Sequence, residues 1–326
     1  MKWAAFLLTL AGLALATWLI GGFGLAEVMA LLGQAGWGIA AVVLFHAVQV
    51  LFSAWAWRTI AGPTVPRPGL GAFMALRWIR EGVNNLLPVA QIGGEIVAAR
   101  LLRRRGINLA QAVAGSVGDL TMEMLTQIAF TLLGLALLIL LVGESGVGGY
   151  VLGGLAVAGG GAAAFIAAQW FGLAGWIERG ILKLSNSFGW APLGEIAGLD
   201  AAIRDIYRHP GRAALACLHH TVSWLLGGIE VCLALHLLGT DVGIGEGLVI
   251  EALGQALKAA GFAVPGALGV AEGGYVVVCH LFGLSPELAL ALGLVKRLRE
   301  VVLGVPALFA WQWLESRPAA TLESSA

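Results

Sequence analysis

Long apolar runs separated by short polar stretches dominate the pattern of this chain. Six runs reach the roughly 20 residues that a helix needs to cross the ~30 Å hydrocarbon core of a bilayer. They cover approximately residues 3–22, 36–56, 108–142, 150–170, 213–238 and 286–314. The first run follows Lys2 and contains Ala14-Leu15-Ala16, a sequence that resembles a signal-peptide cleavage site. Because the apolar run continues through Ile20, we interpret it as a membrane helix.

Two further apolar stretches, 69–105 and 246–283, are interrupted by polar residues and helix breakers. Their expected breaks are Pro88, Gly93 and Gly94 in the first stretch, and Pro265, Gly266 and Gly269 in the second. Each arm is too short or too polar for a complete span. Non-helical backbone at membrane depth is tolerated only where protein buries it or where it lines a wet cavity. The pattern therefore predicts two re-entrant helical hairpins.

The two stretches belong to a sequence repeat in which matching residues are separated by one constant offset. The matching pairs are Pro88 with Pro265, Glu95 with Glu272, Gly106 with Gly283, and Glu123 with Glu300. We place the repeats at about 69–142 and 246–314. Prolines and glutamates are costly inside a bilayer, so their duplication favours a function over packing. Hydrophobic segments interrupted by Pro or Gly in both halves are typical of the binding site of a secondary transporter.

Composition supports this fold class, because 59% of the 326 residues are hydrophobic and only 12% are charged. We predict an all-α polytopic membrane protein, a single integral membrane domain over 1–326 with about six transmembrane helices and two inverted-repeat re-entrant hairpins. Residues 172–212 mix charges with aromatic residues, which is typical of amphipathic helices at a membrane surface. We expect this segment to be a cytoplasmic connector.

The distribution of basic residues predicts the orientation. If each hairpin returns to the side from which it entered, the Lys and Arg residues outside the spans fall on one side. The opposite connections, near 23–35, 143–149 and 239–245, contain no Lys or Arg. The positive-inside rule then places both termini in the cytoplasm of a bacterium, with the protein in the inner membrane. The hairpins would open from opposite sides, so the repeats would be inverted.

Polar residues follow single helical faces in both repeats. The candidate substrate-binding residues are Arg77, Arg80, Glu81, Asn84, Asn85, Gln91, Glu95, Asp119, Glu123, Lys258, Glu272, Lys296, Arg299 and Glu300. A charge near the bilayer centre costs about 3 kcal/mol even on a lenient insertion scale, so these groups must face the protein interior. They form either a functional polar cavity or ion pairs that fix helix register. Buried pairs are weak sources of stability, which favours the cavity without excluding the pairs.

Other chemistries have little support in the sequence. No metal-binding, nucleophile or nucleotide-binding motif stands in a suitable context, so we assign no catalytic residue, metal or cofactor. His219 and His220 are adjacent and point to different faces of a helix, which makes them a poor metal pair. The run Arg103-Arg104-Arg105 lies at the end of a predicted membrane helix. It marks topology or contacts anionic headgroups rather than nucleic acid.

Two motifs resemble those of a known family. The stretch from Arg77 to Glu95, RWIREGVNNLLPVAQIGGE, followed by Arg100-Leu101-Leu102, resembles the signature of HpnL-type proteins of hopanoid gene clusters. The second-half stretch Val264–Gly274, VPGALGVAEGG, resembles the P-G-x-x-G-x-x-E pattern of the wider family, the flippase-like transmembrane region of lysylphosphatidylglycerol synthases. The resemblance covers essentially the whole chain. It implies a protein that translocates or handles lipid, without the aminoacyl-transfer activity of the synthases.

We therefore hypothesise that the chain moves or presents a lipid: a hopanoid, another polar-headed isoprenoid or a phospholipid. The central cations would hold the headgroup while the tail stays in the bilayer. Asp119, Glu123, Glu272 or Glu300 would exchange protons during the cycle. Two alternatives stay open. One is an intramembrane enzyme that modifies a lipid headgroup with a carboxylate as general base, and the other is a non-catalytic scaffold for lipid-biosynthesis enzymes. The sequence leaves open the lipid, the direction, the energy source and the oligomeric state.

Overall fold

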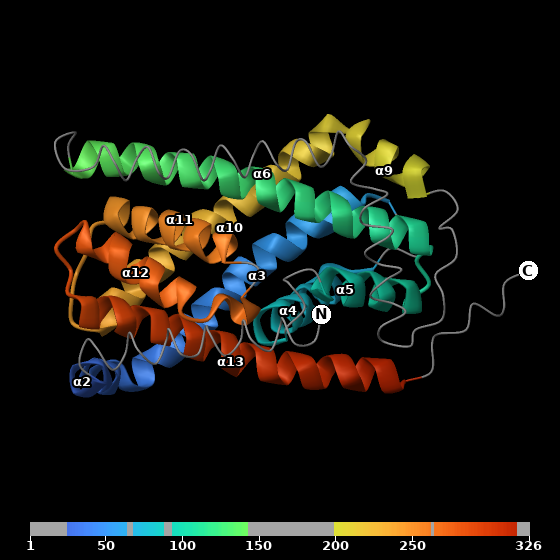
Figure 1. Cartoon of the computed structure of the whole chain (residues 1–326). Coiled ribbons are helices and arrows are strands. Elements are labelled where there is room, and N and C mark those ends of the chain that lie inside the picture. The colour runs from blue at the N-terminus through green and yellow to red at the C-terminus, as the bar shows by residue number, and fades with distance from the viewer. Residues whose placement is uncertain (1–24, 64–67, 88–92, 143–198, 262–263, 318–326) are drawn as a thin grey trace, which may run out of the picture.

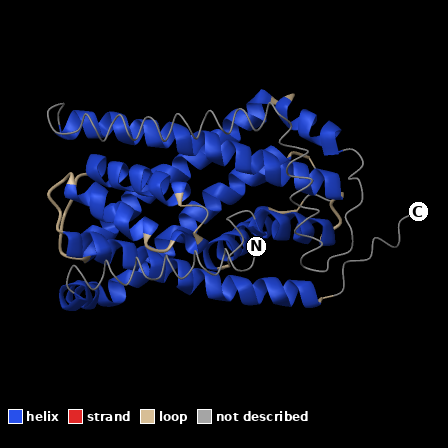
Figure 2. Cartoon of the chain, in the orientation of Figure 1, coloured by secondary structure: helices blue, strands red, loops and turns tan. Residues whose placement is uncertain are grey.

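The computed structural model describes residues 25–63, 68–87, 93–142, 199–261 and 264–317. Over these ranges every regular element is a helix (Figure 2). The predicted spans at 3–22 and 150–170 lie outside the described residues, as do Pro88, Gln91 and most of the connector 172–212. Within that connector, α9 (Leu199–Tyr207) is helical and packs against α6.

Three helical stretches in the described part of the chain are long and apolar enough to cross a membrane. They are Leu25–Ala61, Leu109–Val142 and Pro210–Leu237. They contain α3 (Ile39–Ala61), α6 (Leu109–Val142) and α10 (Pro210–Leu237), which confirms the apolar helices expected at 36–56, 108–142 and 213–238. The expected helix at 286–314 is α13 (Pro286–Ser316), whose 31 residues suffice in length. It is more polar at its centre than the other three, because Lys296, Arg297, Arg299 and Glu300 lie close together there.

The described part of the segment 23–35, expected to be a connection, is helical instead. Residues Leu25–Ala35 form α2, and the short η1 (Gly36–Gly38) joins it to α3. The reason lies in the spacing of apolar residues along one face, where Val28 and Ala35 are buried. This face has a partner, because α2 packs against α13.

Four shorter helices pack in two pairs. Helix α4 (Leu70–Leu86) packs against α5 (Gly93–Arg104), and α11 (Ile244–Ala260) packs against α12 (Val270–His280). The short η2 (Pro265–Ala267) lies between α11 and α12. At 1.5 Å per residue, an arm of 11 or 12 residues spans only about 17 Å, too short to cross a bilayer.

The first break was placed incorrectly at Gly93 and Gly94. Both glycines are the first residues of α5, so the chain leaves the helical conformation before them. Gly94 has a packing role instead. A Cβ atom at Gly94 would collide with the carbonyl oxygen of Arg80 and lie 2.8 Å from Oδ1 of Asn84. The missing side chain lets α5 approach the backbone of α4.

The helices are arranged around a central crossing. Helices α6 and α13 run in opposite directions along opposite sides of the bundle, and α3 and α10 pack against each other between them (Figure 1). Helix α4 packs against α13, whereas α11 packs against α6. Each helix pair thus packs against the long helix that follows the other pair: α13 follows the pair α11–α12, and α6 follows the pair α4–α5.

The boundaries of several elements also recur at the repeat offset. The start of α12 corresponds to that of α5, and the start of α13 corresponds to that of α6. Gly106 and Gly283 precede the two long helices with φ of 88° and 71°, a left-handed conformation that glycine adopts without steric cost. The N-cap side chains of Asn108 and Ser285 then accept from Ala110 N at 2.8 Å and Leu288 N at 3.2 Å.

Polarity is distributed as in a protein that faces lipid. Large apolar side chains are exposed on α6, α10 and α13, for example Leu140, Leu218 and Phe309. The interior contains two apolar cores, one around Trp57 and Phe73 and one around Leu235 and Ile250. Many charged side chains are buried between these two cores.

Replacing Gly94 by Ala is expected to destabilise the protein by about 1–3 kcal/mol, because the added methyl group meets backbone that cannot move without separating the arms. The measurement is thermal unfolding in detergent. The matched control is Gly71→Ala on exposed α4 surface, where nothing lies within 4 Å and the higher helix propensity of Ala stabilises by up to about 1 kcal/mol. Equal effects of the two changes would contradict the packing role.

Candidate functional site

The first charge cluster joins α4, α5 and α6, and consists of Arg77, Arg80, Glu81, Glu95, Asp119 and Glu123. The Arg77 guanidinium donates to both carboxylate oxygens of Glu123 and, through Nε at 2.9 Å, to Glu81. Bidentate pairs of this kind fix orientation as well as charge. Arg77 thereby ties α4 to the middle of α6.

Arg80 is the central cation of the first cluster. Its Nε donates to Glu95 at 2.8 Å, and its two terminal nitrogens donate to Asp119 and Glu123. Asn84 supports the same carboxylate, because its Nδ2 lies 3.2 Å from Glu95 and its Oδ1 accepts from Gly94 N at 2.8 Å. One arginine therefore connects α4 to both α5 and α6.

The second charge cluster joins α10, α11, α12 and α13, and consists of Glu230, Glu251, Lys258, Glu272, Lys296, Arg297, Arg299 and Glu300. Lys258 pairs with Glu300 at 2.5 Å. Arg297 donates to Glu272 at 3.0 Å, to Glu300 at 2.9 Å and to the Gly266 carbonyl at 2.8 Å. The last bond satisfies a carbonyl of η2, between α11 and α12.

Deeper in the second cluster, Glu230 and Glu251 neutralise two cations of α13. Glu230 accepts from Arg299, and Glu251 accepts from Lys296. The side chain of Glu230 is completely buried. Such a carboxylate needs several donors, and Gln49 of α3 supplies another at 2.5 Å.

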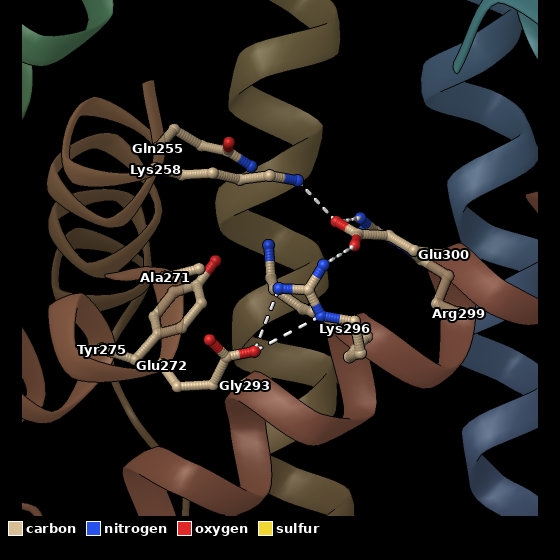
Figure 3. A pocket seen from close by; sticks show the side chains of 10 residues that line it. Gln255, Lys258, Ala271, Glu272, Tyr275, Gly293, Lys296, Arg299 and Glu300 are labelled. Atoms are coloured by element: carbon tan, nitrogen blue, oxygen red, sulfur yellow. Dashed lines mark hydrogen bonds and ion pairs between the residues drawn. The ribbon is translucent and has the colours of Figure 1, made fainter. Parts of the chain in front are cut away.

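A small cavity lies within the second cluster, between α11, α12 and α13 (Figure 3). Its volume of ≈ 10 Å³ is about the space of one water molecule. Gln255, Lys258, Glu272, Tyr275 and Lys296 are among its lining residues. The cations on its wall already have carboxylate partners, so a larger anionic group would have to displace a carboxylate.

Two contacts connect the clusters. His46 of α3 lies 3.3 Å from Glu81 of the first cluster and 3.2 Å from Glu230 of the second. Asn85, at the end of α4, accepts from Lys258 Nζ at 3.4 Å. The end of α4 also packs against η2, so the two helix pairs meet at this point.

Repeat-related glutamates occupy similar positions. Glu95 lies in the first turn of α5 and pairs with Arg80; Glu272 lies in the first turn of α12, pairs with Arg297 and accepts from Gly269 N at 2.8 Å. Acidic groups at helix N-termini are favourable. The repeat also contains reversals of charge, because Lys258 and Lys296 stand at the positions equivalent to Glu81 and Asp119.

The structure thus brings the described candidate residues into two adjoining clusters. The candidate substrate-binding set omits six participants: His46, Gln49, His220, Glu230, Glu251 and Arg297. His46 and Glu230 are isolated charged or titratable residues inside the apolar runs 36–56 and 213–238, a pattern that indicates a buried functional group. His220 lies 2.9 Å from Asp119, whereas the adjacent His219 stacks on Trp55.

Buried charges between helix pairs within an apolar bundle define a polytopic helical membrane protein with a central polar region. The chain belongs to the family described as the lysylphosphatidylglycerol synthase TM region, whose model matches residues 3–307. This membership indicates a function related to membrane lipids. Neither a curated protein nor a solved structure gave a match in the other two comparisons.

Replacing Glu230 by Gln is expected to lower stability by about 3–5 kcal/mol, because it removes the carboxylate that Arg299 hydrogen-bonds and leaves only Glu300, 4.0 Å away. Thermal unfolding in detergent measures the loss. Glu315→Gln is the control, since Glu315 pairs with Arg100 at the solvent-accessible end of the bundle, where an ion pair contributes about 0–1 kcal/mol. A change at Glu230 as small as that at Glu315 would show that the buried pair does not stabilise the fold.

Proposed function

We propose that this chain translocates a lipid between the leaflets of a bacterial inner membrane. The two charge clusters would hold the polar headgroup while the tail remains in the bilayer. The observation that carries the proposal is the position of the clusters, which lie where the interior ends of two short helix pairs meet. Buried ion pairs contribute little net stability, so stability alone gives little reason to keep so many of them.

The arrangement of the helices supports alternating access. Helix α5 ends at the right of Figure 1, where α6 begins, and α12 ends at the left, where α13 begins. We interpret the two pairs as re-entrant hairpins that enter from opposite faces and are related by an inverted repeat. The reciprocal packing of α4 on α13 and of α11 on α6 supports this interpretation. Inverted repeats around a central site are the usual basis of alternating access.

The arginines support an orientation with the right end of Figure 1 in the cytoplasm. That end contains the C-termini of α5 and α13, where Arg100 and Arg104 pair with Glu315, and the start of α10, where Arg212 lies against Gly62. At the opposite end, the segments 25–38, 238–243 and 281–285 contain no Lys or Arg. This asymmetry is the one that the positive-inside rule requires.

Lys258 and Arg297 are the best candidates for contact with a headgroup. Their side chains are 16% and 18% exposed, whereas those of the other four cluster cations are at most 7% exposed. Both line the cavity. An anionic headgroup would replace Glu300 or Glu272 as their partner, so binding would open the cavity rather than fill it. Hopanoids, other isoprenoids and phospholipids are the candidate lipids.

A second candidate function is an intramembrane enzyme that modifies a lipid headgroup. The observation that favours it is the position of the cavity, which lies within the second cluster alone. Such an enzyme would have a one-sided site with one carboxylate, such as Glu272, as general base. Mass spectrometry of lipid co-purified with the protein separates the two functions. A transporter returns the same lipid after incubation, and an enzyme returns an altered headgroup.

Glu95→Gln and Glu272→Gln are each expected to reduce lipid movement at least tenfold while folded yield falls less than twofold. Glutamine keeps the size of the side chain but removes the charge that holds Arg80 or Arg297. The assay follows a headgroup-labelled lipid of the co-purified class between the leaflets of reconstituted vesicles. Glu315→Gln is the control. Collapse of folded yield with normal movement per folded molecule would instead make these glutamates structural.

A further inference from the structure

His46 is placed unusually for a histidine, because each of its ring nitrogens faces a carboxylate. Nδ1 lies 3.2 Å from Oε2 of Glu230, and Nε2 lies 3.3 Å from Oε2 of Glu81. Glu230 also accepts from Arg299 and Gln49, and Glu81 accepts from Arg77. Both carboxylates have a cationic donor of their own, which favours their ionised form.

If both carboxylates are ionised, a neutral imidazole leaves one of the two contacts without a proton. A neutral imidazole has one N–H, so its other nitrogen would direct a lone pair at a carboxylate oxygen. The imidazolium form has two N–H groups and donates to both carboxylates. We propose that the Glu81–His46–Glu230 bridge binds one proton, carried on His46, and that this proton couples α4 to α10. The coupling is a refinement of the proposed transport function, whereas the protonation itself is independent of it.

The charge balance of the surroundings agrees with this assignment. The two clusters contain eight carboxylates and six Lys or Arg side chains. His46 and His220 are the histidines that contact these carboxylates within the described chain. The charged groups around His46 are Arg77 and Glu81 of α4, Glu230 of α10, Lys296 and Arg299 of α13, and, through Arg77, Asp119 and Glu123 of α6.

Exposure decreases stepwise along the bridge. The side chain of Glu81 is 23% exposed, that of His46 is 15% exposed and that of Glu230 is completely buried. A proton can therefore reach the bridge at Glu81, while Glu230 and the cations of α13 stay shielded. His46 therefore replaces Asp119, Glu123, Glu272 and Glu300 as the proposed site of proton exchange. Each of those four carboxylates pairs with Lys or Arg.

The repeat offset also relates α3 to α10, because Gly62 and Gly239 correspond and both have positive φ. It gives the bridge a counterpart that contains neither a histidine nor a carboxylate. Ser223 stands at the position equivalent to His46, and Ser53 stands at the position equivalent to Glu230. The two serine hydroxyls lie 3.1 Å apart, again between α3 and α10. Equivalent contacts on the two sides are thus His–Glu and Ser–Ser. Loss of the proton would weaken the His46–Glu230 contact and leave the Ser53–Ser223 contact unchanged. A change of pH would therefore act on one side of the α3–α10 crossing.

The test is the ¹⁵N spectrum of histidine-labelled, full-length protein reconstituted in bilayers at pH 7. His46→Gln identifies the signals of His46. We expect both ring nitrogens of His46 to be protonated. In Glu81→Gln, which removes a partly exposed carboxylate, we expect one nitrogen to lose its proton at the same pH. An unprotonated nitrogen on His46 in the unmodified protein, unaffected by Glu81→Gln, would overturn the proposal.

Two controls separate the proton site from transport. His236 is 66% exposed and lies 2.6 Å from one carboxylate, that of Asp241, so its protonation should be unchanged by Glu81→Gln. In the vesicle assay with the co-purified lipid, movement should depend on pH in the unmodified protein and lose that dependence in His46→Gln. If His46 is protonated but no lipid moves, the proposed transport function is wrong and the proposed proton site stands. If lipid moves but His46 is unprotonated, the proposed proton site is wrong and the proposed transport function stands.

Discussion

The burial of charge between helices is the constraint on which the rest of this structure depends. An ion removed from water must be paired and hydrogen-bonded, or it costs several kcal/mol. Arg80 therefore fixes the relative positions of α4, α5 and α6, and Arg297 and Arg299 fix those of α10, α12 and α13. The apolar cores on either side set the distances between helices, but apolar side chains tolerate sliding. The ion pairs do not, so they determine register.

Much of the fold could be predicted because the relevant signals are local. Apolar runs gave α3, α6, α10 and α13 to within a few residues, and the breakers gave two pairs of short helices. Gly93 and Gly94 were assigned to the break because the sequence alone does not distinguish a glycine that permits close helix packing from one that ends a helix. The helix α2 was missed because a short amphipathic segment between longer apolar runs reads as a connection.

The site was predicted less completely, because pairing depends on distance in space. Helical spacing brought Arg77, Arg80 and Glu81 together, but nothing in the sequence assigns Glu230 to Arg299 or His46 to Glu81. A search for single polar residues in apolar runs would have found Glu230 and His46. A wider search at the repeat offset would have found Gly62 and Gly239, which both have positive φ after α3 and α10. Those glycines extend the repeat to include α3 and α10.

The charge reversals between the repeats have an energetic consequence. If two halves had identical residues, exchanging their conformations would give states of equal free energy, and a carrier would occupy both equally. Glu81 and Asp119 are replaced by Lys258 and Lys296 at the equivalent positions, so the two exchanged states cannot be equivalent here. In the proposed cycle one orientation is therefore the resting state, selected by the protein before any lipid or gradient acts on it. A difference of about 1.4 kcal/mol would already populate that state about tenfold over the other.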